Sequence, residues 1–163
     1  LDCSRICYAS RMKNQTTHEQ NLALAFAASW NLLEKRLDRV LGAIRGISFA
    51  EYRLLRALSD APNAWASRVD LAQTVGLTPS GVTRALRPME KLGYVATAKS
   101  KRDARLALAS LTPAGQDLVN DASGVVDDIM KTILERSPKI YSKLDEMIVL
   151  LEDFGGQAIQ GVG

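Results

Sequence analysis

The sequence has few of the residues that carry most enzyme and metal chemistry. Its 163 residues include one histidine, His18, and two cysteines, Cys3 and Cys7. There is no CxxC pair, no histidine cluster and no glycine-rich phosphate loop between a strand and a helix. A histidine-based catalytic triad would have to use His18, close to the N-terminus. We therefore expect no enzymatic activity, no bound metal and no cofactor.

Long apolar runs and a disulfide framework are also missing. No apolar run approaches the roughly 20 residues that cross a bilayer, and residues 1–12 lack the apolar core and cleavage site of a secretory signal. A disulfide between Cys3 and Cys7 would close only a short loop. These observations favour a cytoplasmic protein with no membrane partner, whose fold does not depend on a disulfide.

The overall composition is typical of a folded domain. Apolar residues make up 47% and charged residues 24% of the chain, and the length suits one domain or a small domain with a dimerisation arm. The net charge of +3 fits nucleic-acid binders and ordinary proteins alike, so the distribution of charge has to decide between them. We expect residues 1–18 to be a disordered N-terminal extension.

Apolar spacing predicts a long amphipathic helix within residues 19–46 and two further stripes after Thr112. The last stripe has strict four-three spacing, which is typical of the face by which one continuous helix packs against another helix. The three stripes are Leu22, Phe26, Trp30, Leu33, Leu37, Leu41 and Ile44; Leu118, Ala122, Val125, Ile129 and Ile133; and Ile140, Leu144, Met147, Leu151 and Phe154.

Capping residues predict where the other helices begin. Ser48 and Glu51 form a capping box before a helix that buries Tyr52, Leu55 and Leu58. A looser cap at Ser67 precedes a short helix carrying Val69, Ala72 and Val75 and stopped by Gly76. Three hydroxyl–proline pairs then mark helix starts, at Thr78-Pro79, Thr112-Pro113 and Ser137-Pro138.

A β-hairpin is expected between the first two of these helix starts. Residues 94–98 and 106–111 are short apolar segments on either side of a polar tip, residues 99–105. The fold class is thus mainly α with a small β-hairpin wing. These elements divide the chain into an N-terminal helix in residues 19–46, a middle lobe in 47–112 and C-terminal helices in 113–163.

The helix from Pro79 to about Leu92 has one packing side and one outward side. Val82, Leu86 and Met89 share a face, and the opposite face carries short hydroxyls followed by basic side chains. With the preceding short helix and turn it forms a helix-turn-helix, whose second helix enters a major groove. Solvated positions with no partner are the alternative. The outward residues are Ser80, Thr83, Arg84, Arg87 and Lys91.

Two further features bear on this helix. Residues 84–105 hold seven basic residues and two acidic ones, Glu90 and Asp103, so positive charge is concentrated there. Pro88 lacks an N–H group and should kink the helix. In that arrangement the turns through Arg87 would read DNA, and residues 89–92 would support the wing.

The order of these elements resembles the MarR family of winged helix-turn-helix transcriptional regulators. The resemblance implies a homodimer that binds double-stranded DNA. Residues 19–46 and 113–163 would then be its N- and C-terminal dimerisation helices, and residues 47–112 its winged helix-turn-helix DNA-binding lobe. The resemblance rests on Leu71-Ala72-Gln73-Thr74-Val75-Gly76-Leu77, Gly81-Val82-Thr83-Arg84, Met89-Glu90-Lys91-Leu92-Gly93-Tyr94-Val95 and Leu111-Thr112-Pro113-Ala114-Gly115.

The wing motif is the most specific part of this resemblance. Arg102-Asp103-Ala104-Arg105 is similar to the family's Asp-x-Arg motif, which implies that Arg105 enters a minor groove and that Asp103 orients it. A surface ion pair is the alternative. The full set of expected DNA contacts is Ser67, Thr78, Pro79, Ser80, Gly81, Thr83, Arg84, Arg87, Lys99, Lys101, Arg102, Asp103 and Arg105.

The resemblance also suggests regulation by a small aromatic or phenolic effector. Trp30, Arg45, Phe49 and Tyr52 are the expected lining residues, with an ordinary core role as the alternative. We thus predict a ligand-responsive repressor that binds an inverted-repeat operator. Two alternatives remain, a winged-helix module for protein interaction and a redox-sensing regulator using Cys3 and Cys7. The position of the usual sensing thiol aligns near Ala23, which weakens the redox alternative.

Overall fold

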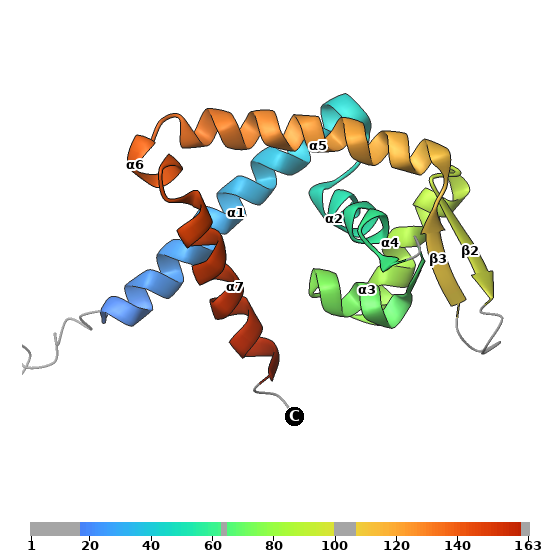
Figure 1. The fold of residues 1–163 in the computed structure, drawn as a ribbon, viewed down its shortest axis with the longest axis horizontal. Coiled ribbons are helices and arrows are strands. Elements are labelled where there is room, and N and C mark those ends of the chain that lie inside the picture. Colours follow the sequence, from blue (N-terminus) through green and yellow to red (C-terminus); the bar gives the residue numbers. More distant parts are fainter. Residues whose placement is uncertain (1–16, 63–64, 100–106, 161–163) are drawn as a thin grey trace, which may run out of the picture. The chain divides into compact units, whose positions relative to one another are not determined.

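The computed structural model describes residues 17–62, 65–99 and 107–160 (Figure 1). Helices dominate, and a three-stranded sheet lies in the middle of the chain. The elements are α1 (His18–Arg45), α2 (Phe49–Ser59), β1 (Ala66–Ser67), α3 (Arg68–Val75), α4 (Pro79–Lys91), β2 (Val95–Lys99), β3 (Ala107–Leu111), α5 (Pro113–Leu134), α6 (Pro138–Tyr141) and α7 (Leu144–Gln160).

The chain divides into two compact units at Arg36 and Leu37, within α1. In the first unit no residue from 17 to 36 is buried, so the part of the apolar stripe that lies there forms no buried core. The next two members of the stripe, Leu37 and Leu41, are fully buried in the second unit. Only the C-terminal part of the long helix therefore contributes to a core.

The predicted caps are confirmed at four of the five helix starts. Ser48 and Glu51 form a complete capping box, and so do Ser67 and Asp70. Thr78 and Thr112 each accept a hydrogen bond from the N–H group three residues later, at 3.1 Å. Each of these hydroxyls satisfies a backbone donor that has no partner within the helix. Ser137 makes no such bond.

The predicted hairpin is confirmed, and a strand that we did not expect joins it. β2 and β3 are antiparallel, with Val95 opposite Leu111 and Lys99 opposite Ala107. β1 pairs with the other edge of β3, so the strand order is β1-β3-β2. β1 has only two residues, which is too short for a recognisable alternation of apolar and polar side chains.

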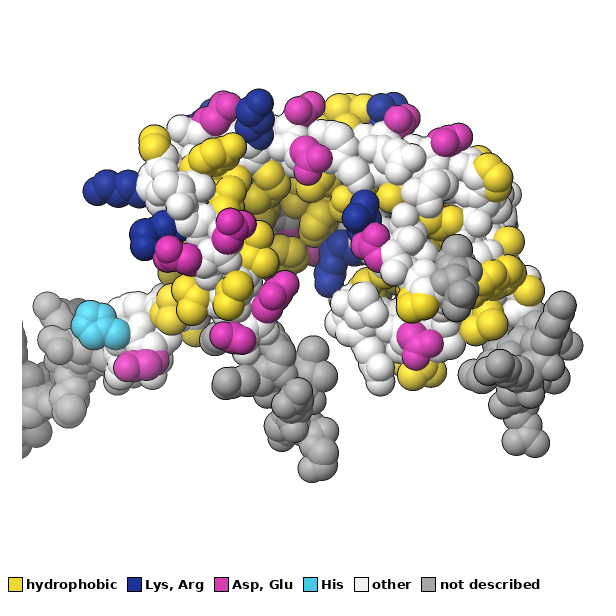
Figure 2. Space-filling model, viewed as in Figure 1, with side chains coloured by type: hydrophobic (Ala, Val, Ile, Leu, Met, Phe, Trp, Pro, Cys, Tyr) yellow, Lys and Arg dark blue, Asp and Glu magenta, His cyan; other side chains and the backbone are white. Residues whose placement is uncertain are grey.

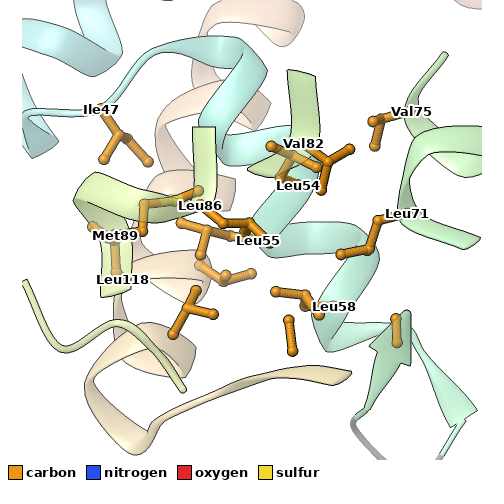
Figure 3. Close-up of a cluster of buried hydrophobic side chains, with 14 of the residues drawn as sticks. Ile47, Leu54, Leu55, Leu58, Leu71, Val75, Val82, Leu86, Met89 and Leu118 are labelled. Atoms are coloured by element: carbon orange, nitrogen blue, oxygen red, sulfur yellow. The ribbon is translucent and has the colours of Figure 1, made fainter. Parts of the chain in front are cut away.

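The core lies in the second unit, where α2, α3, α4 and α5 meet (Figure 3). Leu54, Leu55 and Leu58 of α2 pack there against Leu86 of α4 and Leu118 of α5. Val69, at the start of α3, is 50% exposed. Helical periodicity turns Leu71, Ala72 and Val75 inward instead.

The C-terminal helix expected from Pro138 onward is broken. α6 ends after one turn at Tyr141, and α7 begins at Leu144. The N–H of Lys143 bonds to the carbonyl of Ile140, three residues back, which tightens the chain at the break. The four-three spacing of the apolar residues continues across the break, so the sequence pattern predicted one uninterrupted helix. None of the helices in residues 17–62, 65–99 and 107–160 is both long and apolar enough to cross a membrane.

Candidate nucleic-acid interface

α3 and α4 form a helix-turn-helix. Gly76 ends α3 in the left-handed conformation, with φ of 69°, and the chain reverses there before Thr78 caps α4. Val82, Leu86 and Met89 are fully buried, as predicted. Three buried anchors on successive turns fix the rotation of α4 about its axis and so determine which residues face outward.

The outward face of α4 is polar and positively charged. Ser80, Arg84, Arg87 and Lys91 are exposed, and none of the described acidic residues pairs with these three cations. An arginine that is not held by a carboxylate can place its planar donors on a phosphate or on the edge of a guanine. α4 is therefore able to present two guanidinium groups to a duplex.

The residues around the start of α4 have structural roles. The Thr78 hydroxyl accepts from Gly81 N–H at 3.1 Å, and the Thr83 hydroxyl donates to the carbonyl of Pro79 at 2.9 Å. A Cβ atom at Gly81 would lie 3.2 Å from the Thr78 hydroxyl, so glycine leaves room for this cap. The lone pairs of Thr83 Oγ1 remain able to accept hydrogen bonds.

Ser67 is less accessible than our list of DNA contacts requires. Its side chain is 9% exposed. The hydroxyl donates to Asp70 Oδ2 at 2.8 Å and accepts from Asp70 N–H at 3.1 Å. The hydroxyl group thus caps α3, and we leave Ser67 out of the contacts proposed below.

Pro88 lies inside α4 and does not end it. The helix continues to Lys91, and the Pro88 carbonyl accepts from Leu92 N–H at 3.0 Å. The expected kink, and the support of the wing by residues 89–92, stay predictions. In the wing, Lys99 is the last residue of β2, and Lys101, Arg102, Asp103 and Arg105 lie outside the described residues.

Sequence reasoning missed a cluster that joins three elements. Glu90 Oε1 accepts from Arg68 Nη2 of α3 at 3.4 Å and from the hydroxyl of Thr97 in β2. Arg68 Nε is buried with no hydrogen-bond partner among the described residues. The only available signal was that Glu90 is the single acidic residue in a basic helix.

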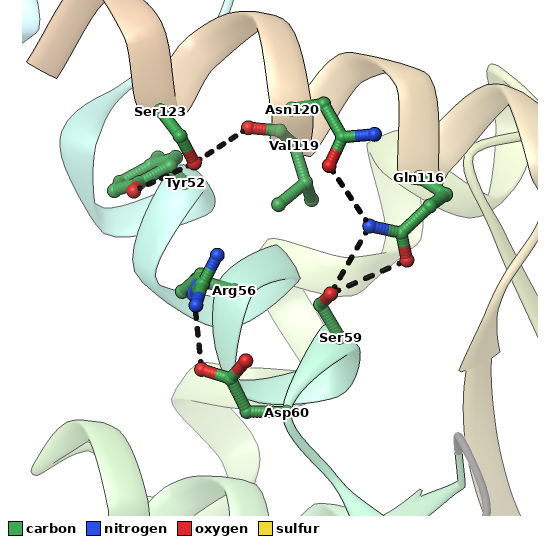
Figure 4. Close-up of polar contacts among 8 residues, drawn as sticks. All are labelled: Tyr52, Arg56, Ser59, Asp60, Gln116, Val119, Asn120 and Ser123. Atoms are coloured by element: carbon green, nitrogen blue, oxygen red, sulfur yellow. Dashed lines mark hydrogen bonds and ion pairs between the residues drawn. The ribbon is translucent and has the colours of Figure 1, made fainter.

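The residues expected to bind an effector are engaged in packing. Phe49 and Tyr52 stack with ring centroids 5.9 Å apart, and the Tyr52 hydroxyl lies 3.1 Å from Ser123 Oγ of α5 (Figure 4). Arg45 pairs with Asp121 at 3.4 Å. Trp30 belongs to the first unit. Phe49 and Tyr52 therefore have the contacts of an ordinary core role, and an effector would have to displace some of them. The Arg45–Asp121 pair is partly exposed and Trp30 is 38% exposed, so a core role does not account for these two residues.

A cavity of about 470 Å³ lies elsewhere in the second unit, at the C-terminal end of α2 and beside α3. Trp65, Asp60 and Asp70 line it together with apolar residues. None of the four residues expected to bind an effector contributes to its walls. α5, at the top of Figure 2, carries four aspartates and one lysine, and is thus mainly acidic.

Comparison with known proteins shows which fold and which family this chain is similar to. The family model described as MarR family matches residues 45–106, which hold the helix-turn-helix and the base of the wing. The crystal structure of Sco3205, a MarR family transcriptional regulator from Streptomyces coelicolor in complex with DNA, is similar with a TM-score of 0.71 and 29% identity. That similarity covers 84% of this chain and 88% of Sco3205. The chain resembles the MarR family.

Two further proteins are similar to this chain. A MarR/EmrR family regulator from Acinetobacter sp. ADP1 shares the fold, with a TM-score of 0.75 at 22% identity over 88% of this chain and 99% of that one. The HTH-type transcriptional regulator YdgJ of Bacillus subtilis (strain 168), itself uncharacterised, is 29% identical over 102 residues, or 60% of this chain. The match spans 61% of the length of YdgJ.

Proposed function

We propose that this chain is a MarR-family transcriptional regulator that binds double-stranded DNA in a sequence-specific manner. The observation that carries the proposal is the outward face of α4, where Arg84 and Arg87 are exposed without a described acidic partner. Buried anchors hold α4 in this orientation before any partner binds. The Sco3205 complex with DNA supports the same role for a similar fold.

We further propose that the regulator is a homodimer on an inverted-repeat operator. Apolar side chains are exposed along α7, among them Ile148, Val149, Leu150 and Leu151. Exposed apolar surface of this extent is typical of an association site, and twofold association presents two copies of α4. The two recognition helices would then contact half-sites about one turn of DNA apart, ~34 Å.

We also propose that the regulator is a repressor and that a small aromatic effector controls its binding to DNA. A ligand weakens DNA binding only if it prefers a dimer in which the two α4 helices have the wrong separation. Trp30, Arg45, Phe49 and Tyr52 remain the proposed effector residues. A ligand that broke the contact from Tyr52 to Ser123 or from Arg45 to Asp121 would change how α5 packs against the DNA-binding lobe.

Selection of bound sequences from random duplex DNA tests the central claim. The purified chain should enrich an inverted repeat, and the logarithm of its affinity for that duplex should fall linearly with the logarithm of salt concentration. Enrichment of no sequence, together with salt-independent binding, would show that the winged helix serves protein interaction instead. A control chain carrying Arg84→Ala and Arg87→Ala should enrich no repeat.

A further inference from the structure

Three elements of the DNA-binding lobe meet at one carboxylate oxygen. Glu90 Oε1, in the last turn of α4, accepts from Arg68 Nη2 of α3 and from the Thr97 hydroxyl of β2. The side chains of Arg68 and Glu90 are 24% and 29% exposed, so the ion pair is only partly screened by water. We call these three residues the Arg68–Glu90–Thr97 bridge.

The bridge is the second of two attachments between α4 and the wing. The first lies at the turn, where Gly93 has φ of 77° and Tyr94 N–H bonds to the Met89 carbonyl at 2.9 Å. Thr112, at the start of α5, donates to the Gly93 carbonyl at 2.6 Å. Pairing with β1 and the burial of Ala109 already hold β3, whereas β2 is an edge strand of the sheet. The contact at Thr97, four residues beyond Gly93, gives this edge strand a second attachment to α4 and so limits its tilt about the turn.

We infer that the Arg68–Glu90–Thr97 bridge aims the wing, which makes Glu90 and Thr97 positioning residues for DNA recognition. The inference rests on the proposed function. A hairpin already held in its bound direction loses less conformational freedom when DNA binds, and the complex is correspondingly tighter. The role of Glu90 therefore differs from that of a surface acid, although it lies in a helix that faces DNA.

A positioning role for Glu90 predicts a change in DNA affinity opposite to the one that charge repulsion alone predicts. A carboxylate close to DNA repels phosphates, so its neutralisation alone should tighten binding to every duplex. If Glu90 aims the wing, Glu90→Gln should weaken binding to the preferred duplex, because a neutral amide holds Arg68 less strongly than a carboxylate does. Thr97→Val should do the same without a change of charge.

The test measures affinity for a duplex enriched by selection and for a scrambled duplex of the same composition. We expect Glu90→Gln and Thr97→Val each to weaken binding to the enriched duplex by about tenfold and not to weaken binding to the scrambled one. Thr97→Val should leave the salt slope unchanged, since no phosphate contact is lost, and Thr97→Ser should restore affinity. The control variants are Asp117→Asn and Thr132→Val in α5, which should bind like the wild type.

Amide hydrogen exchange of the free protein provides a readout without DNA. Residues 95–98 should exchange faster in Glu90→Gln and Thr97→Val than in the wild type or the two control variants. Tighter binding of Glu90→Gln to both duplexes, or unchanged exchange and affinity in Thr97→Val, would overturn the inference. A wild-type chain that does not distinguish the two duplexes would instead overturn the proposed function, and the exchange rates would still show whether the bridge orders β2.

Discussion

Arg84 projects from the outward face of α4, in the turn between the buried anchors Val82 and Leu86. Its side chain is exposed, and the proposed function assigns its guanidinium a contact with a base edge. Arg84→Ala should weaken binding to the selected duplex by about 1–3 kcal/mol, as measured by fluorescence anisotropy. Arg136→Ala removes an exposed arginine after α5 and should leave the affinity unchanged. An equal loss in both variants would show that only total charge matters.

Gly115 illustrates how one missing Cβ atom permits a close contact. A Cβ there would lie 2.0 Å from the Tyr94 carbonyl oxygen at the base of the wing, whereas nothing lies within 4 Å of one at Gly124 in the same helix. Gly115→Ala should lower the free energy of unfolding by about 3 kcal/mol. Gly124→Ala should raise it by about 0.5–1 kcal/mol, because alanine favours the helix. Urea denaturation measures both, and a neutral Gly115→Ala would contradict the close packing.

Among whole elements, helices that start with a hydroxyl–proline pair differ in how much the hydroxyl contributes. Thr78 caps α4 with a hydrogen bond to Gly81 N–H, and Ser137 makes no capping bond at the start of α6. Thr78→Ala should therefore cost about 1 kcal/mol of folding free energy, while Ser137→Ala should cost almost nothing. Thermal unfolding of the two variants measures the difference, and equal losses would contradict the cap geometry.

At the scale of the whole molecule, α7 exposes an apolar surface that the second copy of the chain would cover in the proposed homodimer. Leu151 is 48% exposed, and the proposed homodimer buries this surface. Leu151→Glu should shift the chain from dimer to monomer, since a carboxylate placed in an apolar interface loses its hydration without gaining a partner. Sedimentation equilibrium measures the change, with Lys139→Glu in α6 as a control that stays dimeric. A Leu151→Glu variant that remains a dimer would place the interface elsewhere.

Local chemistry in the sequence determined most of the secondary structure of this protein. The capping boxes, the hydroxyl–proline pairs and Gly76 act within a few residues of their own positions, so the helices begin and end where those residues predict. The buried and outward faces of α4 followed from periodicity for the same reason. The interruption at residues 142–143 was missed because the apolar spacing continues across it.

Contacts between distant residues were decided only by the tertiary structure. β1 forms only by pairing with β3, some forty residues later in the chain. The hydroxyl groups of Ser67 and Tyr52 have structural roles because Asp70 and Ser123 lie within hydrogen-bond distance of them. The Arg68–Glu90–Thr97 bridge joins three separate elements, and no spacing along the chain encodes it. A capping bond requires only nearby atoms, whereas these contacts require the core of the second unit to bring α3, α4 and the sheet together first.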